Sequence, residues 1–129
     1  MRGVTFPAWQ SGAESTALIE LLLAVGTAVV GRNVSWTMTD CEFASGRRGS
    51  DLLAEAAANG RQLTTRELVD LVSDGIQLVD GDVTCRTSSG EPILILRSVR
   101  GDEWDVFATD DAVLEAVRRC FCQVNDLPG

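Results

Sequence analysis

The sequence predicts an α+β fold: a mainly antiparallel sheet, made of a β-meander plus one N-terminal strand, with helices packed on one face. Some segments carry apolar residues at every third or fourth position, which is typical of amphipathic helices. Others alternate apolar and polar residues, which is typical of half-buried strands. The alternating segments follow one another through residues 76–108 with only tight turns between them, and this favours antiparallel pairing.

The length of 129 residues suits one domain, which we expect over residues 13–125. Residues 1–12 contain Pro7 and two glycines without periodicity, so we expect a flexible tail there and another at residues 126–129. The apolar stretch of residues 16–30 is too short to span a bilayer and lacks the basic start of a signal peptide. We therefore expect a buried amphipathic helix in a cytoplasmic protein without a membrane partner, with a signal peptide as the alternative.

Helices are expected at residues 13–30, 51–59, 64–74 and 110–123. The third has the clearest start, because Thr64 and Glu67 have the spacing of a capping box and Leu68 lies on the apolar face behind them. In the last helix, Asp110 and Asp111 fall in or before the first turn, where negative charge complements the helix dipole.

Strands are expected at residues 33–39, 76–79, 83–87, 92–99 and 103–108. Asp80-Gly81 is typical of a hairpin turn between the second and third of these. The first strand has one polar face and is expected at an edge of the sheet. Trp36 and Trp104 fall in the apolar phase of their strands, so we expect both in the core.

The run from Ile93 to Leu96 is apolar on both faces, which predicts a central strand. If Ile93 and Ile95 face the helices, Leu94 and Leu96 lie on the opposite, open face. Apolar residues at the centre of an open face would form a surface suited to docking a protein.

The chain contains no Lys, His or Tyr, and all 11 of its basic residues are Arg. Without His there is no Ser-His-Asp triad and no imidazole ligand, and without Lys there is no Schiff base or P-loop lysine. These absences disfavour an enzyme, and no cofactor is expected.

Four cysteines are the remaining candidates for a metal site: Cys41, Cys85, Cys120 and Cys122. The last two are two positions apart on an expected helix, where side chains point to nearly opposite sides. We therefore expect no metal site and read the cysteines as reduced, mostly buried thiols, with a disulfide as the alternative.

The net charge of −8 resides entirely in residues 67–129. Its densest part runs from residue 102 to residue 115 and contains six acids and no base. Such a surface disfavours nucleic acid and suits a basic protein partner. The residues expected to contact that partner are Asp102, Glu103, Asp105, Asp110, Asp111, Leu94 and Leu96. The simplest alternative is that the acids form an ordinary solvated face.

Three further patterns are weaker. Arg47-Arg48 in a Gly- and Ser-containing loop would suit an anion. Asp80 and Asp82 would suit a cation but lack the further carboxylates of a calcium loop. Glu42, Asp40 and the acids of the meander could supply a carboxylate pair for acid–base chemistry, as in any acidic chain.

The hypothesis that best fits these observations is a small acidic protein-binding module. Bacterial immunity proteins, which neutralise cognate toxins, are often small, acidic and α+β, and this likeness of type favours an inhibitor of a basic toxin or enzyme such as a nuclease. The alternative is a scaffold or adaptor subunit that forms a homodimer or docks through the open sheet face. A small enzyme using carboxylates and Arg is the third hypothesis.

Overall fold

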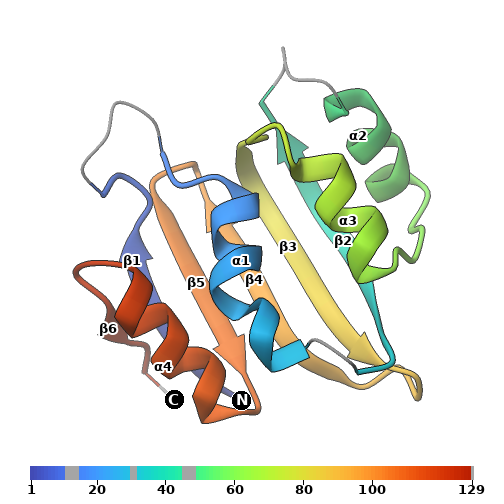
Figure 1. Ribbon diagram of the computed structural model, residues 1–129. Coiled ribbons are helices and arrows are strands. Elements are labelled where there is room, and N and C mark those ends of the chain that lie inside the picture. Colours follow the sequence, from blue (N-terminus) through green and yellow to red (C-terminus); the bar gives the residue numbers. More distant parts are fainter. Residues whose placement is uncertain (11–14, 30–31, 45–48, 129) are drawn as a thin grey trace.

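The computed structural model, which describes residues 1–10, 15–29, 32–44 and 49–128, is a six-stranded antiparallel sheet with four helices on one face (Figure 1). This arrangement confirms the predicted α+β fold. The elements are β1 (Arg2–Pro7), α1 (Leu18–Val29), β2 (Val34–Phe43), α2 (Ser50–Ala58), α3 (Thr65–Val72), β3 (Leu78–Thr87), β4 (Pro92–Val99), β5 (Glu103–Ala108), α4 (Asp111–Cys120) and β6 (Asn125–Asp126).

The strand order is β2-β3-β4-β5-β1-β6, and β2 lies at an edge as predicted. The expectation of a tail over residues 1–12 is wrong for β1, which pairs with β5 from Arg2 opposite Ala108 to Pro7 opposite Glu103. The expected C-terminal tail is wrong at Asp126, which pairs with β1 through β6. The first and last strands of the chain therefore lie side by side.

The expected hairpin at Asp80-Gly81 is also wrong, because residues 78–87 form the single long strand β3. Gly81 has a φ of 122°, and a β-carbon placed on it would lie 2.5 Å from Cα of Cys41 on β2. The glycine is therefore needed where the neighbouring strands β2 and β3 approach each other closely, beside irregularities in their register after Thr39. The meander has three strands instead of four.

The core lies between the helices and the sheet. Trp36 and Trp104 are fully buried in it, as predicted. The indole Nε1 of Trp104 donates a hydrogen bond of 3.0 Å to the backbone oxygen of Thr16, which ties β5 to the segment before α1. Buried polar groups must be paired in this way to avoid a desolvation cost.

The predicted capping box of α3 is confirmed, since Thr64 accepts a hydrogen bond from the backbone of Glu67 and the Glu67 carboxylate accepts one from the backbone of Thr64. The last helix ends earlier than predicted, at Cys120, because Phe121 adopts an extended conformation. In the part of the chain that the structure describes, no helix is both long and apolar enough to cross a membrane.

Candidate functional site

The face of the sheet that carries no helix is the candidate site, and we call it the open face (Figure 1). Side chains alternate along each strand, so the residues between the core positions of β1, β3, β4 and β5 lie on this face. Its central members are Thr5, Asp82, Thr84, Ile93, Ile95, Arg97, Val99, Glu103, Asp105 and Phe107.

The centre of the open face is apolar. Ile95 on β4 lies opposite Thr84 on β3 and opposite Phe107 on β5. Phe107 in turn lies opposite Gly3, where an added β-carbon would approach its ring to 2.7 Å. The aromatic ring thus lies close to the backbone of β1, and glycine at position 3 makes room for it. Gly3, Ile95 and Phe107 form an apolar row that is only partly buried, beside the buried Thr84.

An ion pair borders this row. Arg97 donates from Nε to Asp82 Oδ1 at 2.8 Å and from its terminal nitrogen to Asp82 Oδ2 at 3.0 Å. Its Cζ also lies 5.1 Å from the centroid of the Phe107 ring, within the range of a cation–π contact. The hydrogen bonds to Asp82 raise the pKa of Arg97, and the charge of Asp105 contributes further. Arg97 is therefore held in place between the two strands.

Asp105 lies on the other side of Arg97, directly opposite it in the register of β4 and β5. Its Oδ1 atom is buried, and no described residue donates a hydrogen bond to it. A buried acceptor without a donor costs about 1–3 kcal/mol, and more when the group is charged. The open face therefore contains a buried oxygen to which no residue in the described part of the chain donates a hydrogen bond.

Leu94 and Leu96 were expected on this face, and that expectation is wrong. Both are buried in the core, with 1% and 0% of their surface exposed, and Ile93 and Ile95 take the open face in their place. An unbroken apolar run shows no alternation of apolar and polar residues, so the pairing with neighbouring strands decides which side chains point to the core. Here the buried Trp104 lies opposite Ser98, which fixes the even-numbered residues of β4 toward the helices.

The acids of the predicted segment do not form one cluster. Asp102 and Glu103 are exposed at one end of β5, and Asp105 lies within it. Asp110 and Asp111 follow the other end, about 26 Å of extended chain away. Within the described chain, neither Asp102 nor Glu103 forms an ion pair.

Asp110 and Asp111 have structural roles at the start of α4. The Asp110 side chain caps the helix by accepting a hydrogen bond of 2.9 Å from the backbone of Ala112. Asp111 forms a salt bridge of 3.1 Å with Arg2 on β1, with both side chains largely exposed. Of the acids predicted to contact a partner, only Glu103 and Asp105 lie on the open face.

The weaker patterns do not build a site in the described chain. Arg47 and Arg48 lie outside the residues that the structure describes. Asp82 is held by Arg97, and Asp80 accepts a hydrogen bond of 2.8 Å from the backbone of Arg100. No group of three or more potential metal ligands occurs among the described residues.

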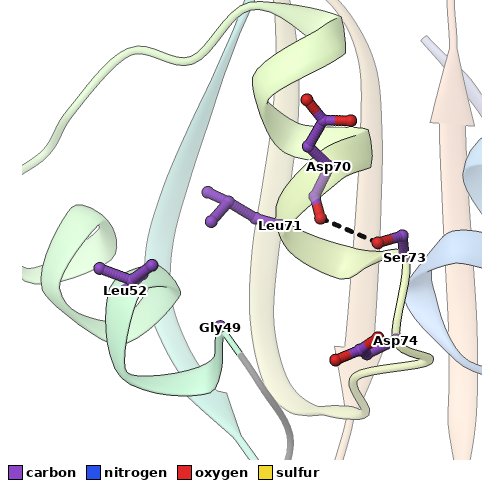
Figure 2. Close-up of a pocket in the computed structure, with 6 residues that line it drawn as sticks. All are labelled: Gly49, Leu52, Asp70, Leu71, Ser73 and Asp74. Carbon is purple, nitrogen blue, oxygen red and sulfur yellow. Dashed lines mark hydrogen bonds between the residues drawn. The ribbon is translucent and has the colours of Figure 1, made fainter.

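A pocket of about 300 Å³ lies between the start of α2 and the end of α3 (Figure 2). Leu52 and Leu71 line it from the two helices, and Asp70, Ser73 and Asp74 line it at the end of α3. Both carboxylates are exposed, so solvent screens their charges. Among the described residues that line the pocket, no polar side chain is buried, so none is placed to select a ligand.

Sequence reasoning missed Ile95, Arg97 and Phe107 as surface residues. The phase of Trp104 and Val106, both in the core, was enough to place Phe107 outside it. Arg97 was identifiable as the only charged residue within the expected strand at 92–99.

No protein-family model, curated protein or solved structure matches this chain.

Proposed function

We propose that this chain is a small protein-binding module that docks a basic protein on its open face and neutralises it, in the manner of an immunity-type inhibitor. The observation that carries the proposal is Asp105, whose buried Oδ1 accepts no hydrogen bond from the described chain. The Asp105 side chain as a whole is only partly buried, and its rotation would let a donor from a partner, above all an arginine or lysine side chain, satisfy this oxygen with a charge-assisted hydrogen bond.

The surroundings of Asp105 support a protein as the partner. Ile95 and Phe107 supply partly exposed apolar surface beside it, and specific interfaces combine such an apolar centre with a polar rim. The fixed ion pair between Arg97 and Asp82 presents a rigid surface. Rigid surfaces lose little conformational entropy on binding.

The charge of the chain supports a basic partner. Arg97 balances Asp82, which leaves Asp105 and Glu103 as the unbalanced acids of this half of the open face. The net charge of −8 adds a long-range field that accelerates encounter with a positively charged protein. The same charge disfavours a homodimer through this face, because two identical acidic surfaces repel each other.

We propose binding in place of catalysis, because the chain has no His, Lys or Tyr to act as a general base or nucleophile near neutral pH. We also propose a cytoplasmic location. The inhibitor would there meet a basic toxin or nuclease before it reached its target.

The test begins with affinity capture from the organism that carries the gene, using the purified wild-type chain and a Phe107→Asp variant in parallel. Phe107→Asp places a charge in the apolar row. We expect a basic protein that binds the wild-type chain, is lost with the variant, and has an enzymatic activity that the wild-type chain inhibits. A partner that is acidic, that is nucleic acid, or that binds both forms equally would contradict the proposal.

A further inference from the structure

The four cysteines fall into two classes by their environment. Cys41 and Cys85 lie on β2 and β3, partly and fully buried, whereas Cys120 and Cys122 at the end of α4 are both exposed. All four are free thiols. Exposure controls the access of reagents to a thiol, so the two classes differ in chemistry.

We expect the thiols of the first class, Cys41 and Cys85, to react slowly. Burial raises the pKa of Cys41 from an ordinary value of 9.0 to about 11, and it raises that of Cys85 to about 11 as well. The thiolate is the reacting species. Each pH unit changes its fraction tenfold, so at neutral pH this shift lowers the thiolate fraction by about 100-fold.

The second class is arranged as a pair. Phe121, between the two cysteines, is extended with a φ of −127° and a ψ of 158°, and its ring stacks on Phe6 at 4.4 Å. Since Phe121 is held against β1, the cysteines on either side of it are left at the surface. An extended residue between them sets their Cα atoms about 6.6 Å apart, at the upper end of the range that a disulfide spans.

The backbone of this segment is held in place. The side-chain amide of Gln10 accepts a hydrogen bond of 2.6 Å from the backbone nitrogen of Cys122 and donates one of 3.2 Å to its backbone oxygen. Gln10 also donates a hydrogen bond of 2.7 Å to the backbone oxygen of Pro7, at the end of β1. Helical spacing, which separates cysteines two positions apart, does not apply here, because α4 ends at Cys120.

We propose that Cys120 and Cys122 form a reactive dithiol that exchanges with low-molecular-weight disulfides and closes into an intramolecular disulfide. In the first step one thiolate attacks a sulfur of the external disulfide, which forms a mixed disulfide and releases one small thiolate. In the second step the other protein thiolate attacks the protein sulfur of the mixed disulfide and releases the second. The protein loses two electrons and two protons, and the external disulfide is reduced to two thiols.

The test exposes the reduced, folded chain to oxidised glutathione and follows its intact mass. In the wild-type chain we expect a transient single glutathione adduct, followed by a product that lacks two hydrogen atoms. Peptide mapping should link Cys120 to Cys122. In Cys120→Ser and Cys122→Ser the adduct should persist, because the second thiol is missing. Cys41 and Cys85 should react at least ~100-fold more slowly in the folded chain.

The unfolded wild-type chain is the control, because all four thiols should then react at similar rates. The Cys120→Ser/Cys122→Ser double variant should lose the fast reaction and retain its circular dichroism spectrum. Three results would overturn the proposal: stable glutathione adducts on both cysteines of the wild-type chain, a disulfide between two chains, or a fast reaction that persists in the double variant.

Discussion

Arg97 on β4 donates two hydrogen bonds, of 2.8 and 3.0 Å, to the carboxylate of Asp82 on the neighbouring strand β3. Its guanidinium is therefore directed toward β3. Asp105 lies opposite Arg97 on β5 and is left with a buried oxygen that no described residue satisfies. One arginine between two aspartates thus forms hydrogen bonds with only one of them.

The ion pair should contribute modestly to stability, because the two side chains are 42% and 28% exposed. We expect Arg97→Gln and Asp82→Asn each to lower the free energy of unfolding. A double-mutant cycle measured by urea denaturation should give a coupling energy of about 1 kcal/mol. A coupling energy near zero would contradict a stabilising role for this pair.

Asp105→Val should stabilise the free protein. The change removes a buried acceptor that lacks a donor and adds a residue with high strand propensity, so the free energy of unfolding should rise by about 1–2 kcal/mol. Glu103→Val is the matched control, because it removes the same charge from an exposed position of β5. It should change stability by less than about 0.5 kcal/mol. A destabilised Asp105→Val variant would indicate that Asp105 is satisfied within the fold.

Gly81→Ala should be strongly destabilising. Its β-carbon would approach Cα of Cys41 to 2.5 Å at a φ of 122°, so we expect a loss of about 2–4 kcal/mol. Gly90→Ala is the control, because Gly90 also has a positive φ but no atom lies within 4 Å of an added β-carbon. It should cost about 1 kcal/mol. Equal losses in thermal denaturation would contradict the close approach of β2 and β3.

Glu67 should stabilise the fold in a pH-dependent way. The hydrogen bond from the backbone of Thr64, with further help from Thr64 and Arg61 side chains, lowers the pKa of Glu67 below its ordinary 4.5. A lowered folded-state pKa gives stability that is present above pH 4.5 and is lost as the pH falls through the folded value. The stability difference between wild type and Glu67→Gln should therefore shrink as the pH falls below 4.5. A difference that stays constant in urea titrations down to acidic pH would contradict this.

Local signals predicted much of the fold. The capping box at Thr64 and Glu67 depends on neighbouring residues only, and sequence alone was enough to find it. Long-range pairing was harder to predict. In β1, Val4 and Phe6 alternate as a strand should, but Gly3 and Pro7 obscure the pattern. The need for Gly3 becomes visible only when Phe107 lies over it.

The candidate site was predicted in part. The open face and the outward phase of Glu103 and Asp105 follow from alternation along β5. The face on which Leu94 and Leu96 lie could not be predicted in this way, because an apolar run fits either face of the sheet until the register with β5 is known. The separation of Asp102 from Asp110 likewise depends on β5 being extended between them.

The most direct test of the open face as the binding surface is the association rate of the captured basic partner, measured at several salt concentrations. Glu103→Arg/Asp105→Arg alters the open face, and Asp70→Arg/Asp74→Arg makes the same change of charge at exposed positions near the end of α3. Circular dichroism should show that both variants fold. The account predicts that the first variant slows association by about 10-fold or more at low salt and weakens its salt dependence, while the second stays within about 2-fold of wild type. Equal slowing by both variants, or no slowing by the first, would contradict it.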